Sequence, residues 1–242
     1  MRGISKRFGA VQALTDVDFE VFPAEIVALV GDNGAGKSTL IKCIAGTHAP
    51  DEGTISFEGR EVKITTPADA TRLGIETVYQ DLALCDNLDV VQNMFLGRER
   101  LTRIARRFSE IEMECQALDV MAGLHVTTIG SVRQKVAQLS GGQRQSVAIS
   151  KAVMWNSKVV ILDEPTAALG VEQTEQVLAL IRRLREQGLG VVVISHNIVE
   201  LLSVADRIIV LRLGRRVATF NGHEVAPDDV VAAITGARQF TV

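Results

Sequence analysis

The octapeptide GDNGAGKS at residues 31–38 constrains the fold of this chain more than any other stretch. It matches the phosphate-binding pattern G-x-x-x-x-G-K-[ST], whose glycines let the backbone curl and point several N–H groups at one phosphate. The apolar run IVALVG (26–31) before it predicts a buried strand, and KSTLIKCIAG (37–46) after it predicts a helix. Because a phosphate loop needs this strand and this helix, we expect a true phosphate site rather than a chance glycine-rich turn.

Three side chains at the end of this loop have separate expected roles. Lys37 is expected to reach the β- and γ-phosphates of a nucleotide, while Ser38 offers its hydroxyl to Mg²⁺ and Thr39 adds another phosphate contact. The helix that begins here would add the partial positive charge of its N-terminus. The nucleotide-binding residues predicted in the loop are Gly31, Asp32, Asn33, Gly34, Ala35, Gly36, Lys37, Ser38 and Thr39.

A second stretch, VVILDEP (159–165), predicts the acidic half of the same site. Four apolar residues form a core strand, and Asp163 and Glu164 follow at its carboxyl end, where ligands bind in open α/β sheets. Asp163 suits the role of holding Mg²⁺ through water, and Glu164 suits the role of polarising the water that attacks the phosphate. The alternative is a solvated acidic turn, which the preceding apolar run and the phosphate loop disfavour.

Two further polar residues lie where the predicted strands end. The strand GVVVISH (190–196) ends at His196, whose neutral imidazole could donate one hydrogen bond to the γ-phosphate. Gln80 lies where the mixed pattern gives way to a helical one, and it could contact Mg²⁺ or the attacking water. Taken alone, a single histidine is more often structural than catalytic, and a glutamine in a loop is nearly always without function.

The order of elements predicts an α/β fold, with a P-loop NTPase parallel-sheet core, N-terminal antiparallel β elements and an inserted helical subdomain. The chain is expected to form one domain, 1–242, whose core comprises 1–80 and 151–242 and whose insert comprises about 81–150. The other predicted elements are a first strand at MRGISKRF, hairpins at 51–62 and 207–220, and helices at 67–75, 174–188, 198–206 and 227–236, with helical periodicity through 88–156.

Charge and composition exclude some classes of function. The 26 basic and 29 acidic residues give a net charge of −3, which argues against a domain that neutralises nucleic-acid phosphates. A cluster of arginines resembles a nucleic-acid patch, but with Glu99 and Glu110 beside it a solvated helix face is the better interpretation. The chain lacks an apolar run of about 20 residues, so we expect a soluble, cytoplasmic protein. The clustered arginines are Arg98, Arg100, Arg103, Arg106 and Arg107.

LSGGQ (139–143) suits a phosphate as well, although the chain already has a phosphate loop. With LSGGQ upstream of VVILDEP, GDNGAGKST ahead, Gln80 between and His196 after, nearly the whole chain resembles the ATP-binding cassette (ABC) ATPases. The stretches GIETVYQDLALCDNLDVVQNMFLGRE (74–99) and EPTAALGVEQ (164–173) further resemble the ATPase subunits of monosaccharide importers of the ribose, xylose and fructose type.

The resemblance implies that two cassettes meet head to tail, with each ATP between the P-loop of one and LSGGQ of the other. Ser140 and Gly142 would then contact the γ-phosphate held by the partner, within a loop that also includes Gly141 and Gln143. It also implies that Phe8, which alone would be interpreted as a core residue, stacks on adenine. Gln80 would sense the nucleotide and the membrane subunit, and His196 would be the switch histidine.

Cofactors and partners follow from the same resemblance. It implies ATP and Mg²⁺, a second cassette in a homodimer or with a different chain, a transmembrane permease, indirectly a periplasmic sugar-binding protein, and no nucleic acid. The chain would lie at the cytoplasmic face of the plasma membrane, held through the permease, whose coupling helix would enter a groove of the helical insert. Gly170 departs from the aspartate that cassettes commonly have there, although the sugar-importer ATPases anticipate glycine.

The hydrolysis motifs leave alternatives open. An exporter or an importer for another substrate class would carry the same motifs, and only 74–99 and 165–173 favour a sugar importer. A DNA-acting cassette is disfavoured because roughly 100 residues between the P-loop and LSGGQ cannot hold long coiled coils. A translation-associated cassette is disfavoured because the chain carries one cassette and no charged linker.

Overall fold

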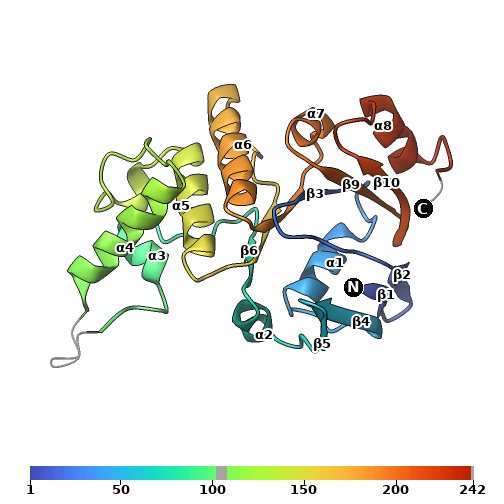
Figure 1. Cartoon of the computed structure of the whole chain (residues 1–242), viewed down its shortest axis with the longest axis horizontal. Coiled ribbons are helices and arrows are strands. Elements are labelled where there is room, and N and C mark those ends of the chain that lie inside the picture. Colours follow the sequence, from blue (N-terminus) through green and yellow to red (C-terminus); the bar gives the residue numbers. More distant parts are fainter. Residues whose placement is uncertain (102–107, 241–242) are drawn as a thin grey trace.

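The computed structural model describes residues 1–101 and 108–240, and Figure 1 shows them as a sheet-based core beside a helical subdomain. The helical subdomain contains α3 (Val90–Phe95), α4 (Glu110–Gly123) and α5 (Gly141–Val153), which gather on the left of Figure 1. None of the helices in the described residues is both long enough and apolar enough to cross a bilayer.

The core is built on a six-stranded sheet in the order β10-β9-β3-β8-β7-β6. All neighbouring pairs are parallel except β9 and β10, which form the predicted antiparallel hairpin around Gly214. Every residue of β3 and β8 is buried, as expected for strands that are covered on both faces. The strands are β3 (Ile26–Val30), β6 (Ile75–Val78), β7 (Val159–Asp163), β8 (Gly190–Ile194), β9 (Arg207–Arg212) and β10 (Arg215–Asn221).

The register of this sheet brings the carboxyl ends of four strands to one edge. Ile194 at the end of β8 pairs with Leu29 of β3 on one side and with Asp163 of β7 on the other. Val78 at the end of β6 pairs with Leu162. The loops that leave these strands therefore start side by side, and this edge, the carboxyl rim, is where the predicted polar residues emerge.

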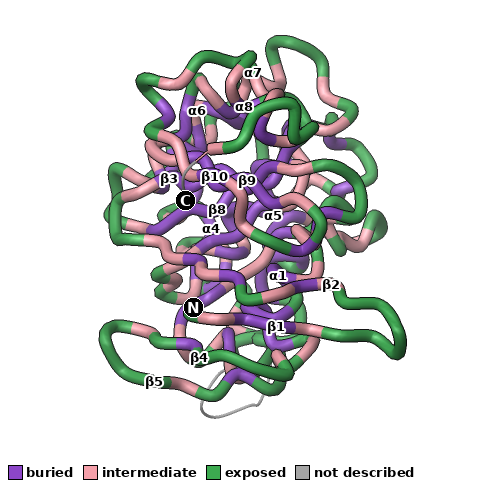
Figure 2. The backbone as a smooth tube through the Cα atoms, turned by 90° about the vertical axis from the view of Figure 1, so that its right-hand side faces the viewer, coloured by how far each residue is buried: buried purple, intermediate pink, exposed green. Residues whose placement is uncertain are grey.

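A second, antiparallel sheet in the order β2-β1-β4-β5 covers α1 (Lys37–Ile44). Alternate residues of the central strands, such as Leu29 and Ile161, pack with Leu40 and Ile41 of α1 and with Leu14 of this second sheet. The tube in Figure 2 shows this buried interior as a nearly continuous purple band between the exposed outer loops. The strands are β1 (Arg2–Phe8), β2 (Val11–Val17), β4 (Glu52–Phe57) and β5 (Arg60–Val62).

The opposite face of the central sheet is covered by α6 (Val171–Glu186), α7 (Ile198–Leu202) and α8 (Pro227–Thr235). Helix α5 contributes Ile149 to this core and Val147 to the separate core of the helical subdomain, so it joins the two bodies. The fully buried Asn93 of α3 binds the neighbouring loop, with its side chain donating to the Cys85 carbonyl and accepting from the Cys85 N–H.

Most predicted elements are confirmed, and the differences have local causes. The sequence does not predict strand β2. Only Leu14 and Val17 of its seven residues are buried, and bulges in the pairing with β1 place them three residues apart, so the alternation typical of a strand is absent. The sequence also does not predict strand β6, because its four residues are too few to show alternation. The helix predicted at 67–75 ends at Arg72, as α2 (Pro67–Arg72), and β6 begins at Ile75. Helix α6 begins at Val171 rather than 174.

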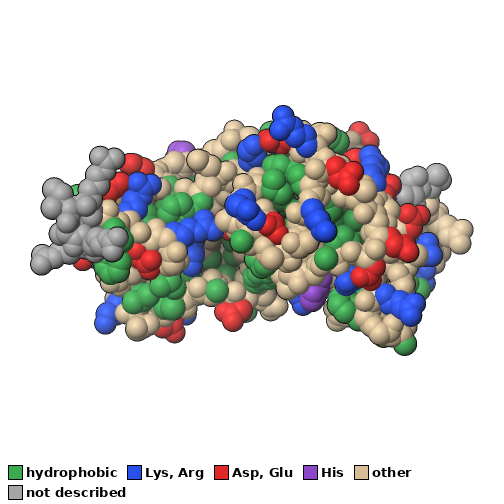
Figure 3. Space-filling model, turned by 90° about the horizontal axis from the view of Figure 1, so that it is seen from below, with side chains coloured by type: hydrophobic (Ala, Val, Ile, Leu, Met, Phe, Trp, Pro, Cys, Tyr) green, Lys and Arg blue, Asp and Glu red, His purple; other side chains and the backbone are tan. Residues whose placement is uncertain are grey.

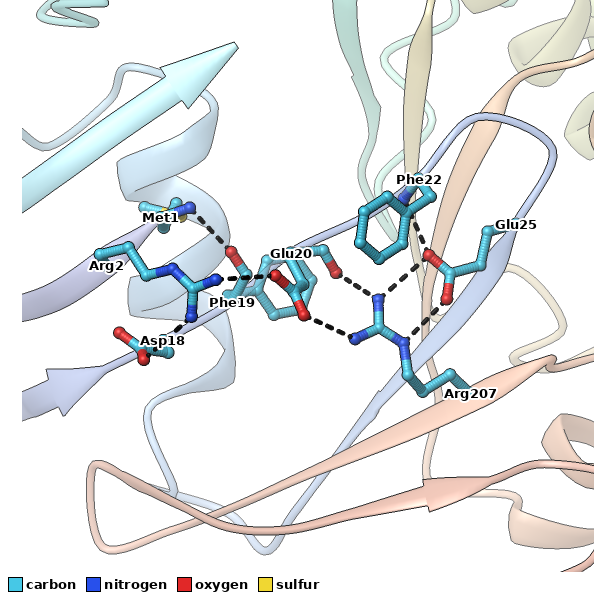
Figure 4. A network of polar contacts seen from close by, with 8 residues as sticks. All are labelled: Met1, Arg2, Asp18, Phe19, Glu20, Phe22, Glu25 and Arg207. Carbon is cyan, nitrogen blue, oxygen red and sulfur yellow. Dashed lines mark hydrogen bonds and ion pairs between the residues drawn. The ribbon is translucent and has the colours of Figure 1, made fainter. Parts of the chain in front are cut away.

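Arg207, the first residue of β9, links the segment around the antiparallel sheet to the central sheet, at the end of β9 away from the carboxyl rim (Figure 4). Its guanidinium contacts the Glu25 carboxylate at 2.8 Å and donates to the Glu20 carbonyl at 2.8 Å. Glu20 also pairs with Arg2 of β1 at 3.2 Å, and the Phe22 ring lies 5.5 Å from the Arg207 guanidinium. This network joins β1 and the segment 18–25 to the start of β9.

The arginine cluster is only partly described. Arg98 pairs with Glu76 at 3.2 Å, and Arg100 pairs with Glu112 at 2.7 Å. The face in Figure 3 likewise shows basic and acidic side chains interspersed. The remaining members, Arg103, Arg106 and Arg107, lie outside the described residues.

Candidate functional site

The phosphate loop depends on three glycines for different reasons. A Cβ at Gly31 would lie 2.2 Å from the Leu211 carbonyl oxygen of β9, and one at Gly36 would lie 2.8 Å from the Ala13 carbonyl oxygen of β2. Gly34 has free space around it but a φ of +81°, which L side chains rarely adopt. All three glycines have a positive φ, and close packing against the carbonyl oxygens of β9 and β2 adds a second requirement at Gly31 and Gly36.

Lys37, the first residue of α1, folds back over the loop. Its ammonium donates to the Gly31 carbonyl at 2.6 Å and to the Asp32 carbonyl at 3.1 Å. Partial burial lowers the pKa of Lys37, while the charges of Glu164, Asp32 and Asp163 oppose that shift. The cation therefore lies between the loop and the acidic end of β7, with Ser38 and Thr39 next to it in the first turn of α1.

The acidic pair lies at the end of β7, and its two carboxylates have different environments. Burial, with the negative charge of Glu164 adding to it, raises the pKa of Asp163, while Lys37 opposes the shift. Glu164 has a φ of +51°, a conformation uncommon outside glycine, and its backbone N–H donates to the Ile194 carbonyl at 2.8 Å. This tie fixes the turn after β7 against the end of β8.

Glu164 has an unsatisfied acceptor. Its Oε2 atom is buried and accepts no hydrogen bond of good geometry from the described residues. The His196 ring comes close, with Nδ1 2.9 Å from that oxygen, although the imidazole itself is largely exposed. Because this oxygen is buried beneath the exposed ring, water reaches it only when the imidazole moves aside.

The residues predicted to hold Mg²⁺ lie at the carboxyl rim. Gln80 is exposed two residues beyond Val78, and Asp163 ends the neighbouring strand β7. In the described part of the chain, no three His, Cys, Asp or Glu residues are grouped so that they could hold a metal ion. One carboxylate with a hydroxyl and an amide fits an ion bound largely through water and nucleotide phosphates, as Mg²⁺ usually is.

LSGGQ forms the N-terminus of α5 and packs against α6. Ser140 caps the helix, its Oγ accepting from the Gln143 N–H at 3.4 Å while the Gln143 side chain accepts from the Ser140 N–H at 2.8 Å. A Cβ at Gly141 would lie 3.0 Å from Leu169, and one at Gly142 would lie 3.0 Å from Gln173. The loop therefore rests on the start of α6 in its own chain.

Gly170 occupies the N-cap of α6 without needing to be glycine. Its φ is −74°, no atom lies within 4 Å of where its Cβ would be, and α6 has no side-chain cap. Neither backbone conformation nor packing within the described chain requires the missing side chain.

Phe8 ends β1 and is 43% exposed, so the interpretation that it is a core residue is wrong. Its ring meets that of His48 edge-on at 5.2 Å, and the Lys6 ammonium lies 5.6 Å from its centroid. An aromatic held this way and left partly open offers a surface on which a base can stack.

A cavity of about 240 Å³ lies between the end of β6 and the helices α3 and α5. Trp155, which sequence analysis did not single out, forms one wall with Arg98, whose guanidinium lies 5.1 Å from the indole ring. Burial lowers the pKa of Lys151, which also lines the cavity. A single tryptophan beside a basic cluster was the available signal, since such residues often anchor binding surfaces.

Comparison with protein families matches residues 14–167 to the family described as ABC transporter. The chain is 48% identical to the fructose import ATP-binding protein FrcA of Rhizobium meliloti, over 98% of this chain and 94% of that protein. It is 45% identical to the xylose/arabinose import ATP-binding protein XylG of Sulfolobus acidocaldarius, over 97% and 92%. The ribose import ATP-binding protein RbsA 1 of Rubrobacter xylanophilus is 43% identical over 98% of this chain, but the match spans 46% of that longer protein.

Solved structures are similar over nearly the whole fold. A nucleotide-free ATP-binding cassette from an ABC transporter has a TM-score of 0.83 with 26% identity, over 96% of this chain and 93% of that one. A dimeric cassette in a post-hydrolysis state, bound to ADP and phosphate, has a TM-score of 0.75 with 26% identity, over 93% and 98%. The predicted P-loop α/β fold with antiparallel elements and a helical subdomain is confirmed.

We expect Asp163→Asn to stabilise the folded chain at neutral pH. A raised pKa means that the folded state binds the Asp163 proton more tightly than the unfolded chain does, so the ionised carboxylate costs folding free energy. This cost is absent at low pH and appears as pH rises through the raised pKa.

Urea unfolding midpoints from acidic to neutral pH, without Mg²⁺, measure this effect. Asp18→Asn is the matched control. A hydrogen bond from the Gly3 N–H lowers the pKa of Asp18, so removing the negative charge of Asp18 should destabilise the fold. A lower midpoint for Asp163→Asn at neutral pH would contradict the expectation.

Proposed function

This chain belongs to the ABC transporter family, and on that premise we propose that it is the ATP-hydrolysing subunit of a monosaccharide importer. The observation that carries hydrolysis is the meeting of the phosphate loop, the acidic pair and His196 at one rim of the sheet. The names of its relatives, which import fructose, xylose or arabinose, and ribose, support a sugar importer over an exporter or another substrate class.

ATP would bind across the phosphate loop and β1. The loop N–H groups of residues 31–36 and the ammonium of Lys37 would hold the phosphates, with Thr39 adding a contact. Ser38, Gln80 and Asp163 are the residues that would hold Mg²⁺, which would neutralise phosphate charge when bound. The raised pKa of Asp163 supports that role, because a bound cation would favour the ionised carboxylate. Phe8 would stack on adenine.

Glu164 would orient and deprotonate the water that attacks the γ-phosphate. Its Oε2 atom is buried beside the exposed His196 ring, so it would accept from such a water once that ring moves aside. His196 has Nδ1 directed at Glu164, which leaves the second ring nitrogen of an exposed imidazole to donate to the phosphate. Lys37 between the loop and the acidic pair would stabilise the charge that develops during transfer.

A second cassette would complete each site. Ser140, Gly141, Gly142 and Gln143 present the N-terminus of α5 while resting on α6, an arrangement suited to the phosphates of a partner. Gly170, which nothing in its own chain requires to be glycine, would lie at the same contact. The similar cassette that is dimeric with ADP and phosphate supports this assembly, and a homodimer is its simplest form.

The cavity beside Trp155 would receive a helix of a membrane-spanning permease. Its lining comes from the end of β6 and from α3 and α5, so with a core of 1–80 and 151–242 and a helical insert of about 81–150, as we propose, a helix seated there would contact both. Tyr79 and Asp81 of its lining flank Gln80, which would connect the carboxyl rim to the permease. The chain would then act at the cytoplasmic face of the membrane, and a periplasmic sugar-binding protein would meet the permease instead.

We expect Glu164→Gln to retain ATP binding but lose most hydrolysis, by about 10²–10⁴-fold, because glutamine cannot take the proton of the attacking water. Phosphate release measures turnover, and equilibrium binding of a fluorescent ATP analogue measures affinity. Lys37→Ala should instead weaken binding, since it removes the loop cation. Hydrolysis at the wild-type rate by Glu164→Gln would refute the role of Glu164.

Ser140→Arg tests whether LSGGQ serves a partner. Chains with this change should bind ATP but fail to hydrolyse it, because the arginine would obstruct the shared site. Mixing them with Lys37→Ala chains should recover part of the activity, since a mixed dimer has one site with an intact phosphate loop and an intact LSGGQ. A mixture that stays inactive would contradict head-to-tail sharing.

Trp155→Ala should release the chain from its permease, because it removes one wall of the cavity. The measurement is the amount of membrane protein that co-purifies with the tagged chain from detergent-solubilised membranes. Ile111→Ala is the matched control, since Ile111 is an exposed apolar residue on α4 outside the cavity lining. Equal recovery with both variants would contradict this location of the permease site.

A further inference from the structure

Glu200 of α7 is bonded to the loop that carries His196. Asn197, the residue after His196, caps α7 by accepting from the Glu200 N–H at 3.4 Å, and its side-chain amide donates to Glu200 Oε1 at 2.6 Å. The Asn197 N–H also donates to the buried Ser195 hydroxyl at 3.1 Å. Residues 195–200 therefore form one locally bonded unit.

The other oxygen of Glu200 reaches across to the turn that follows Glu164. Glu200 Oε2 accepts from the Thr166 hydroxyl at 2.6 Å, a contact between residues 34 apart in the chain. Thr166 is buried and lies two residues beyond Glu164, whose left-handed backbone makes the turn. This is the one side-chain hydrogen bond between 164–170 and 195–202 that the described residues show.

We propose that Glu200 is a positioning residue for hydrolysis, holding the His196 loop and the Glu164 turn in a single arrangement; this inference rests on the proposed ATPase function. The backbone bond from Glu164 to Ile194 ties the strand ends together, but both catalytic side chains project beyond it. Glu200 adds a second tie beyond that point. It thereby sets the approach of His196 Nδ1 to Glu164 Oε2, which are 2.9 Å apart.

The chemistry of this position calls for a carboxylate. Thr166 and Asn197 each donate a hydrogen bond, and Glu200 receives one on each oxygen. Glutamine could keep both contacts only if the Thr166 hydroxyl turned to accept from its NH₂ group, and both hydrogen bonds would then lose their charged acceptor. Hydrogen bonds to a charged group are also stronger and shorter than neutral ones.

The same pattern separates the two glutamates of the rim by role. Both oxygens of Glu200 accept hydrogen bonds from protein donors, whereas Oε2 of Glu164 has only the approach of the His196 ring, without a hydrogen bond of good geometry from the described residues. An occupied carboxylate holds its neighbours in place, and an unoccupied one can accept a proton from water. Glu200 therefore acts through His196 and Glu164 and does not touch the nucleotide.

The test is steady-state ATP hydrolysis by the purified full chain, with kcat and ATP Kd measured separately. Glu200→Gln and Thr166→Val should each lower kcat about tenfold, equivalent to about 1.4 kcal/mol in the barrier, with little change in Kd. The double variant should be no slower than the worse single one, because both remove the same tie. Thr166→Ser, which keeps the hydroxyl, should restore turnover.

Controls separate a positioning role from general damage. Glu186→Gln at the end of α6 removes an exposed carboxylate that makes no side-chain bond with the described residues, and it should hydrolyse ATP as the wild type does. Wild-type kcat in Glu200→Gln and Thr166→Val, multiplicative losses in the double variant, or losses matched by weaker ATP binding would each overturn the proposal. If Glu200→Gln fails to fold, the Thr166 pair decides alone.

Failure of the proposed function would look different. In that case the wild-type chain would not hydrolyse ATP, or Glu164→Gln would leave hydrolysis intact, whatever Glu200 does. A wild type that is active, that loses activity in Glu164→Gln and that tolerates Glu200→Gln would refute only the positioning role.

Discussion

The parallel pairing of β3, β8, β7 and β6 is the constraint on which the rest of the structure depends. Both faces of these strands are covered, so their middles must be apolar and polar residues can appear only at the ends. Pairing of Ile194 with Leu29 and with Asp163 aligns those ends to within one residue. The phosphate loop, the acidic pair and His196 are neighbours for this reason, although they are spread over more than half the sequence.

The arrangement of residues at the carboxyl rim lowers the free energy of unfolding. Burial and the neighbouring charge of Glu164 raise the pKa of Asp163, Glu164 has a backbone conformation uncommon for its residue type, and its Oε2 atom lacks a hydrogen bond from the described residues. Such features persist only where surrounding structure holds them, and here β7, β8 and Lys37 do so. A bound cation would relieve the first of these costs and a hydrogen-bond donor the third, whereas the backbone conformation of Glu164 would stay as it is.

The chain joins two half-sites through one short region. The glycines of LSGGQ pack against Leu169 and Gln173, while Glu164 and Thr166 lie a few residues earlier in the same segment. In a head-to-tail dimer, LSGGQ would serve the partner's nucleotide and Glu164 would serve its own. Movement of the segment 164–173 would therefore change the positions of residues at both sites. Because Gly170 has no side chain, contacts with a partner at this position would be made by its backbone and by neighbouring residues.

Local chemistry in the sequence was enough to determine the phosphate loop, the acidic pair and most helices. Glycines that permit a curled loop, apolar runs that end in carboxylates and residues that cap helices act over a few neighbouring positions, so they are legible without a structure. The tertiary structure alone decided β2 and β6, whose patterns are too short or too irregular, and the Thr166–Glu200 bond. It also gave Gly31 its packing role against Leu211. These features depend on which distant segments the sheet register places together, and a sequence pattern of a few residues does not contain that register.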